Sequence, residues 1–151
     1  MTVRIIKILS LALLLFSCST KKSSPKNNIP AKKSRVADFH YGGYGDTLYA
    51  TLNGEVYQLD TTIKTRDSLI PLSNVSIKIE AYNKTVFTDS SGSFTINLDK
   101  GVFSLLVAKE NYQPLRMKNY VSDPDQYSGT TIYLEPGNEL QTFEIPTRER
   151  N

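Results

Sequence analysis

The chain has 151 residues but only one cysteine, one histidine and no tryptophan. A single cysteine excludes an internal disulfide and a zinc site built from cysteines. A single histidine leaves few ways to build a histidine-ligated metal centre or a Ser–His pair. Paired acid–base carboxylates, phosphate-binding glycine loops and clusters of metal ligands are also missing at recognisable spacing. We therefore expect no enzyme activity, no catalytic residue, no metal site and no cofactor.

Acidic residues are absent from the beginning of the chain, where the first one is Asp38. Eight of the 18 Lys and Arg residues precede it, so the rest of the chain has ten basic residues against 15 acidic ones, a net charge of −5. The formal net charge of +3 therefore comes from a basic N-terminal segment attached to a mildly acidic body. This distribution does not favour a nucleic-acid partner.

A run of apolar residues occupies positions 8–16, after a short basic start. This pattern is typical of a secretory signal peptide and is too short to span a bilayer. The end of the run, Leu15-Phe16-Ser17-Cys18, resembles the lipobox of bacterial lipoproteins. The resemblance implies cleavage after residue 17 and acylation of Cys18, with palmitate among the expected lipids. The alternative is an ordinary signal peptide with an incidental cysteine.

Residues 18–46 lead from that cysteine to the body of the protein. The first part is polar and lysine-rich, contains two prolines and has no apolar period, so we expect a flexible basic tether. No acidic residue follows Cys18 closely, whereas some Gram-negative phyla use acids there as a signal for surface export. We therefore expect a cell-envelope protein held by its lipid to the outer membrane and facing the periplasm.

The rest of the chain reads as short strands separated by turn residues, without an amphipathic helix. In the segment 75–82, for example, alternate residues are apolar and are predicted to face inward: Val75, Ile77, Ile79 and Ala81. Seven strands are predicted, within residues 47–59, 75–82, 85–88, 93–98, 102–109, 114–121 and 130–135. Residues 61–72 are predicted to be a loop or a hairpin insertion. The prediction is one all-β domain, an antiparallel β-sandwich over residues 47–136, followed by a C-terminal tail at 137–151.

Three glycines have specific predicted roles in this body. Gly92, in the turn that begins at Asp89, and Gly101 are expected in the left-handed conformation. Gly54 lies inside a predicted strand, where glycine often marks a bulge or a close approach.

Five short motifs in order resemble the carboxypeptidase regulatory-like domain, a transthyretin-like β-sandwich. They are Gly54-Glu55-Val56, residues 70–77 (IPLSNVSI), residues 88–94 (TDSSGSF), residues 100–105 (KGVFSL) and Asn111-Tyr112. Asn111 stands where the family usually has glycine, and asparagine tolerates the same left-handed conformation. In metallocarboxypeptidases this domain accompanies the catalytic one, so the resemblance implies an accessory module without catalytic residues.

A segment rich in tyrosine and glycine, residues 38–49, is the best candidate for a binding site. Aromatic residues here combine apolar faces with polar groups and are frequent at interfaces. The candidate binding residues are Phe39, His40, Tyr41, Tyr44 and Tyr49. The alternative is that these aromatic residues cover an edge of the sandwich.

One further loop contains Asp123 and Asp125, two residues apart. Calcium prefers six or more oxygen ligands, and only two are evident here, so a turn formed by Asp-Pro is the favoured interpretation.

These observations together predict an accessory envelope lipoprotein, anchored to the membrane and without enzyme activity. Its expected role is to bind an envelope partner protein or to stabilise an envelope assembly, for example through the edge of a sheet. The alternative is a carbohydrate-binding module that uses the tyrosine-rich segment, with a glycan as its partner.

Overall fold

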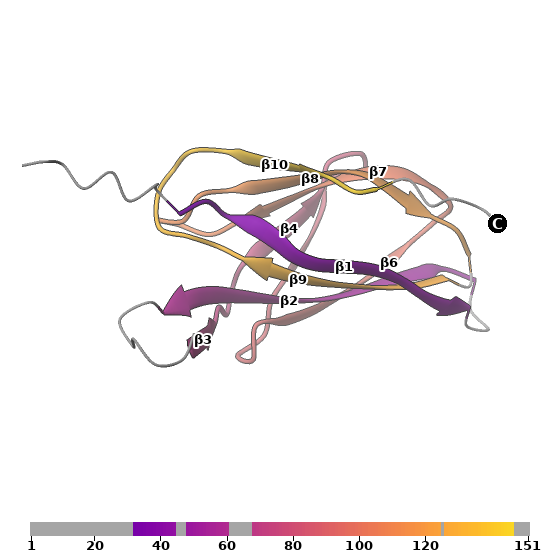
Figure 1. Ribbon diagram of the computed structural model, residues 1–151. Helices are drawn as coiled ribbons and strands as arrows, with labels where there is room; N and C mark the ends of the chain where they lie inside the picture. The colour runs from indigo at the N-terminus through magenta and orange to yellow at the C-terminus, as the bar shows by residue number, and fades with distance from the viewer. Residues whose placement is uncertain (1–31, 45–47, 61–67, 125, 147–151) are drawn as a thin grey trace, which may run out of the picture. The chain divides into compact units, whose positions relative to one another are not determined.

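The computed structural model describes residues 32–44, 48–60, 68–124 and 126–146. These residues form ten β-strands and no helix, arranged as two facing sheets (Figure 1). The predicted all-β sandwich is therefore confirmed. None of the described residues belongs to a helix able to span a membrane. The predicted signal peptide and Cys18 lie outside the described residues, so lipidation stays a prediction.

Each sheet contains five strands. Sheet A consists of β1 (Arg35–Tyr44), β9 (Gln126–Tyr133), β2 (Ala50–Asp60), β3 (Ser68–Pro71) and β6 (Ser93–Leu98). Its centre is β2, which pairs with β9 along one edge and with β6 and then β3 along the other. Sheet B has the order β10 (Gln141–Glu144), β8 (Leu115–Ser122), β7 (Gly101–Ala108), β4 (Ser76–Ile79) and β5 (Lys84–Phe87). Two of the pairings, β2 with β9 and β8 with β10, are parallel, and the others are antiparallel.

All seven predicted strands are present, together with three more, two of which, β1 and β10, extend the sandwich past the predicted boundaries 47–136. Strand β3 forms a hairpin with β2, which agrees with the hairpin interpretation of residues 61–72. Strand β10 lies in the predicted tail, where only four residues pair and Phe143 packs against the core. Such a short element carries too little periodicity to be recognised in the sequence.

Strand β1 lies in the segment predicted to be a tether and lead-in. Shifts in its register against β9, between Val36 and Asp38 and between Tyr41 and Tyr44, interrupt the alternation that would identify a strand. The start of the strand is fixed by the buried hydroxyl of Ser34, which donates a 2.9 Å hydrogen bond to the carbonyl oxygen of Gln113. That Oγ atom also accepts a 2.9 Å bond from the backbone N–H of Glu135. Residues 34–44 are therefore part of the folded domain.

The core lies between the two sheets and is made of the alternating apolar side chains that face inward. The predicted inward set of the segment 75–82 is confirmed for Val75, Ile77 and Ile79, which are all fully buried. The prediction for Ala81 is wrong, because β4 ends at Ile79 and Ala81 is exposed in the turn that follows. The other large, fully buried aliphatic side chains are Leu52, Ile96, Leu98, Leu105, Leu115, Met117, Ile132 and Leu134. Their burial stabilises the fold by roughly 25 cal/mol per Å² of apolar area removed from water.

The turn before β6 shows how local chemistry ends a strand. Gly92 has φ of 79°, as predicted for a left-handed position. The Oδ1 atom of Asp89 accepts hydrogen bonds from the backbone N–H groups of Ser91 (2.8 Å) and Ser93 (3.0 Å) and from the Ser91 hydroxyl (2.7 Å). The bond from the Ser91 hydroxyl, followed by that from the Ser93 N–H, lowers the pKa of Asp89 below its ordinary value.

Asn111 has φ of 68°, so the left-handed conformation expected at this position is confirmed. The expectation for Gly101 is wrong, because its φ is not positive. Gly101 begins β7 in extended conformation, and a Cβ atom there would lie 2.9 Å from the ring of Phe103. Its role is to leave room for that ring.

Candidate functional site

The tyrosine-rich segment predicted as a binding site is divided between the two faces of β1. Phe39 and Tyr41 are partly buried and pack against the core. Their rings meet edge to face, with centroids 5.1 Å apart, and Phe39 also contacts the ring of Tyr120 at 6.1 Å. His40 points to the opposite side, and its side chain is 63% exposed. The rings of Phe39 and Tyr41 thus cover an edge of the sandwich, as the alternative interpretation of this segment predicts.

The remaining predicted residues lie near the end of β1 and the start of β2. Tyr44 pairs through its backbone with Gln126, and Tyr49 is 49% exposed just before β2. Of the five predicted residues, only His40 lines the hollow that the structure shows on sheet A. No group of three or more His, Cys, Asp or Glu side chains within the described ranges is placed to hold a metal ion. Asp123 pairs with Lys100 at 3.8 Å, and Asp125 lies outside those ranges.

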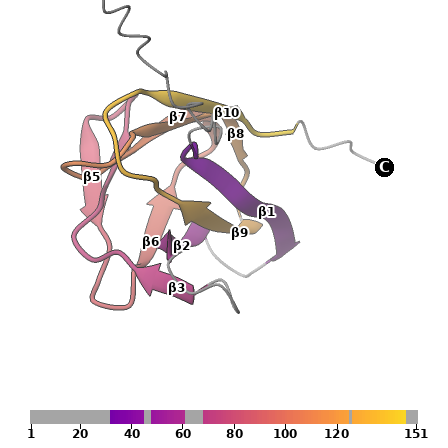
Figure 2. The same ribbon diagram turned by 60° about the vertical axis from the view of Figure 1, so that its left-hand side comes forward.

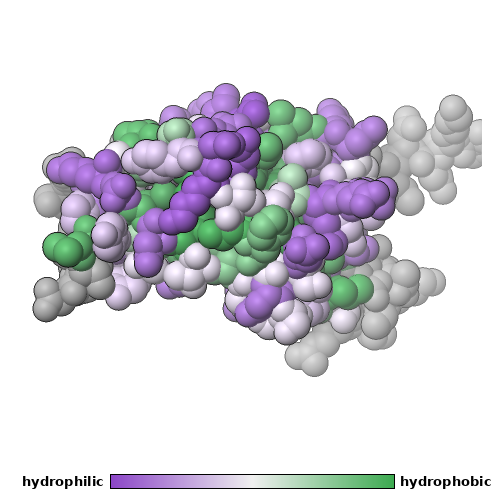
Figure 3. All heavy atoms as spheres, turned by 180° about the vertical axis from the view of Figure 1, so that it is seen from behind, coloured by the Kyte–Doolittle hydropathy of each residue, from purple (hydrophilic) through white to green (hydrophobic). Residues whose placement is uncertain are grey.

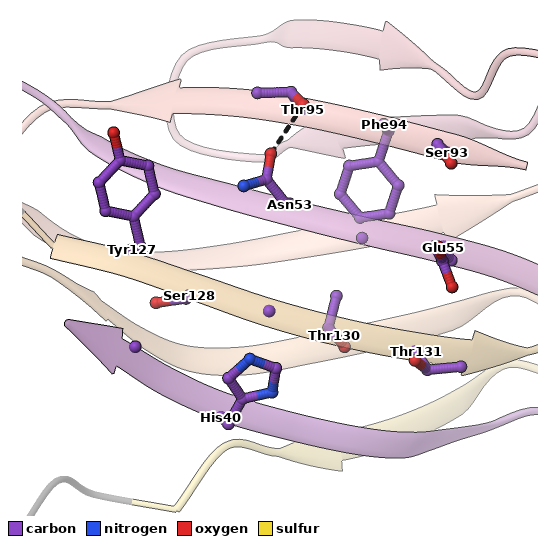
Figure 4. A pocket seen from close by; sticks show the side chains of 13 residues that line it. His40, Asn53, Glu55, Ser93, Phe94, Thr95, Tyr127, Ser128, Thr130 and Thr131 are labelled. Atoms are coloured by element: carbon purple, nitrogen blue, oxygen red, sulfur yellow. Dashed lines mark hydrogen bonds between the residues drawn. The ribbon is translucent and has the colours of Figure 1, made fainter. Parts of the chain in front are cut away.

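The outer face of sheet A carries a hollow of about 450 Å³. It crosses four neighbouring strands, β1, β9, β2 and β6 (Figure 4). The side chains at its surface come from positions that alternate with the buried ones on each strand. They are His40 of β1, Tyr127 and Thr131 of β9, Asn53 and Glu55 of β2, and Ser93 and Thr95 of β6.

The floor of the hollow is formed by Gly129, between Tyr127 and Thr131 on the outer side of β9. The strand register places Gly129 opposite His40 on one side and opposite Asn53 on the other. A Cβ atom at Gly129 would lie 2.3 Å from Cε1 of His40 and 2.5 Å from its Nε2. Glycine in the middle of a central strand weakens the strand, so this residue marks a place where another group approaches closely.

Several polar side chains of the hollow are held by neighbours. The Thr95 hydroxyl donates a 2.8 Å hydrogen bond to Oδ1 of Asn53, drawn as the dashed line in Figure 4. Nδ1 of His40 lies 3.2 Å from Oδ2 of Asp38. The Tyr57 hydroxyl donates a 2.9 Å hydrogen bond to Oε2 of Glu55, and this bond to a carboxylate raises the pKa of Tyr57. These contacts orient the polar side chains for hydrogen bonding.

Sequence reasoning missed this hollow, although its signal is present. The segment QYSGTTIY has a glycine in the middle of an alternating strand, and the outward positions of TLNGEVYQ are polar. The hollow was missed because neither segment indicates which strands will lie next to each other in the sheet. The parallel pairing of β2 with β9 brings Asn53 and Gly129 together from positions 76 residues apart in the chain.

A second surface feature lies at the free edges of the sheets. Strand β3 pairs only with β2, and β5 pairs only with β4. Leu69 and Ile70 of β3 are 43% and 42% exposed, and Phe87 of β5 is 60% exposed. Figure 2 places β3 and β5 on one side of the sandwich and β1 on the other. The face opposite to the view of Figure 1 shows hydrophobic groups at the surface among charged ones (Figure 3).

No protein-family model and no curated protein matches the chain. Among solved structures, similarity is found to chains in crystal structures of two interface mutants of a type II cohesin–X–dockerin complex from Acetivibrio cellulolyticus. The TM-scores are 0.49 and 0.46, with sequence identities of 22% and 19%. In each case the alignment covers 60% of this chain and 60% of the matched chain. The likeness is one of fold alone.

Proposed function

We propose that this protein is a non-enzymatic lipoprotein of a bacterial cell envelope whose β-sandwich binds a partner protein. The observation that carries the proposal is the pair of short edge strands, β3 and β5, which expose Leu69, Ile70 and Phe87 on one side of the sandwich. The ordered motifs shared with the carboxypeptidase regulatory-like domain support the same conclusion, because that domain is an accessory module. The left-handed Gly92 and Asn111 agree with the turns of those motifs.

The edge strands favour a particular way of binding. An edge strand presents unpaired backbone N–H and C=O groups, which a strand of another chain can pair with. Proteins often block such edges with lysine, proline or a covering loop. Strand β5 has Lys84 at its start but ends in Phe87, whose exposed ring offers apolar area beside the backbone edge. We infer that the partner adds an extended segment along β5 and packs against this ring.

The alternative function, carbohydrate binding through the tyrosine-rich segment, requires exposed aromatic rings on that segment. Phe39 and Tyr41 instead pack against the core. We therefore propose that these two residues stabilise the fold and do not bind a sugar.

The lipid anchor is proposed from the lipobox resemblance, with the outer membrane facing the periplasm as the expected location. Replacing Cys18 with Ser should move the protein from the membrane fraction to the soluble fraction. Ser17→Ala serves as the control, since it keeps a small residue before the cysteine. Unchanged membrane fractionation of Cys18→Ser would contradict the anchor.

Partner binding is tested by crosslinking in native membranes, with an affinity tag after Asn151. A photoreactive residue in place of Phe87 or Ile70 should capture one envelope protein in stoichiometric amount. The control position is Val102 at the start of β7, which is 66% exposed but does not lie on β3 or β5. Recovery of the protein alone from all three positions, under conditions that capture a known complex, would refute the proposal.

A further inference from the structure

We propose that the hollow on the outer face of sheet A is a binding site for a neutral oligosaccharide. This site is separate from the edge strands and does not depend on the proposed partner protein. The proposal is carried by three features together: a glycine floor, an exposed aromatic ring beside it, and preorganised neutral hydrogen-bonding side chains.

The shape of the hollow fits an extended ligand that lies across the strands. It covers β1, β9, β2 and β6, whose three spacings amount to about 14 Å at the usual distance between neighbouring strands. At Gly129 no side chain rises from β9, and the imidazole ring of His40 lies in the space that a side chain would take, so a ligand crossing there lies against this ring. A span of this length fits several linked sugar units better than a single small molecule.

The aromatic ring at the hollow is that of Tyr127, which is 39% exposed. Gly42 lies beside it on β1, with its missing Cβ only 3.1 Å from the Tyr127 carbonyl oxygen and 3.5 Å from the Tyr127 Cβ. A larger residue at position 42 would crowd the flank of Tyr127. Tyrosine offers a broad apolar face together with a hydroxyl, which suits the C–H face and the hydroxyl groups of a sugar ring.

The polar groups around the floor are oriented before any ligand binds. Oδ1 of Asn53 is taken up by Thr95, and the Asn53 amide nitrogen donates to no other group in the described part of the chain. Figure 4 shows this nitrogen on the side of Asn53 that faces Tyr127. Glu55 accepts one bond from Tyr57 on Oε2 and keeps Oε1 as an acceptor for a ligand hydroxyl. Side chains fixed in this way lose less conformational entropy on binding.

The charges of the lining exclude other classes of ligand. No Lys or Arg lines the hollow, so a phosphate, a nucleic acid or an acidic glycan would meet no compensating charge. Glu55 and the acidic body would repel such anions. An apolar ligand would leave the hydroxyl, amide and carboxylate groups unpaired, which costs free energy. A neutral, hydroxyl-rich ligand satisfies the lining without either cost.

The test is a glycan array probed with the full chain in detergent micelles, followed by calorimetric titration with the neutral oligosaccharides that bind. Tyr127→Ala should lower the affinity roughly tenfold, through loss of the stacking face. Asn53→Ala should lower it several-fold, and Tyr127→Phe should keep most of it. Tyr82→Ala, which removes another exposed tyrosine outside the hollow, should bind like the unmodified protein.

Circular dichroism and thermal unfolding of each variant verify the fold. If Tyr127→Ala does not fold, Asn53→Ala and Glu55→Gln decide the result, because both side chains are exposed. The proposal is overturned if no neutral oligosaccharide binds at roughly 1 mM, if only acidic glycans bind, or if the hollow variants bind as well as Tyr82→Ala. If the hollow variants lose glycan binding but still crosslink to the partner through position 87, then the two sites are separate.

Discussion

The two faces of sheet A each contain a glycine on a central strand, and the two glycines serve opposite purposes. Gly54 of β2 faces the core, where a Cβ atom would lie 2.2 Å from Cζ of Phe94 and 2.9 Å from Cγ2 of Thr130. Gly129 of β9 faces outward, beneath the exposed ring of His40. The inner glycine makes room for a buried ring that fills the space completely. The outer glycine makes room for the ring of His40, which lies at the surface beside Asp38.

The difference follows from what surrounds each residue. Phe94 is 6% exposed and fixed among core side chains, so it has no free space into which to move. His40 is 63% exposed and can turn into solvent. The same residue type is therefore a strict packing requirement on one face and the seat of an exposed ring, which has room to move, on the other.

The largest effect is expected from Gly54→Ala. The added methyl group would overpack the core against Phe94, at a cost of about 1–3 kcal/mol in the free energy of unfolding. Urea unfolding followed by circular dichroism measures this cost. An unchanged midpoint would show that the core beside Phe94 has room that the structure does not show.

A smaller effect is expected from Tyr120→Phe, also on the inner side. The Tyr120 hydroxyl is buried and donates a 3.2 Å hydrogen bond to Oγ of Ser128, the neighbour of Gly129 on β9. Its loss should cost about 1 kcal/mol at neutral pH. Phe39→Leu, which keeps the hydroxyl, is a control for changes in ring packing around Tyr120.

Alkaline pH sharpens this prediction, because burial raises the pKa of Tyr120 above its ordinary value. A raised pKa in the folded state means that the stabilisation is complete below the unfolded pKa of about 10 and is lost as pH rises through the folded pKa. The unmodified protein should therefore lose stability as pH rises above about 10, and Tyr120→Phe should lose less. Equal losses in both proteins would refute a buried, neutral hydroxyl.

Gly129→Ala should change the stability by less than Gly54→Ala, within roughly 0.5 kcal/mol, as is usual at surface positions. The His40 ring must move away from the new methyl group, and this movement should shift the NMR resonances of the ring. Oligosaccharide binding should weaken, because the floor of the hollow is raised. A loss of stability as large as that of Gly54→Ala would contradict the distinction between the two faces.

The sequence specifies much of the inner face and little of the outer one. Alternation of Val75, Ile77 and Ile79 predicts their burial, and the turn at Gly92 follows from residue types that favour positive φ. Strand β1 was missed because two register shifts break its alternation. The hollow depends on the pairing of β9 with both β1 and β2, and such neighbours in space cannot be read from local pattern. His40 was singled out from the sequence, but the residues around it were not.

The smallest effect concerns the outer face alone. The hydrogen bond from Tyr57 to the Glu55 carboxylate is the main cause of the raised pKa of Tyr57. Glu55→Gln removes the negative charge while an amide oxygen stays available as acceptor, so the pKa of Tyr57 should fall toward about 10. Spectrophotometric titration of the tyrosines should show one group ionising at lower pH in Glu55→Gln, with Thr51→Ala on the same face as the control. An identical titration curve would mean that Glu55 is not held by Tyr57, and the acceptor Oε1 would then not be oriented before a sugar binds.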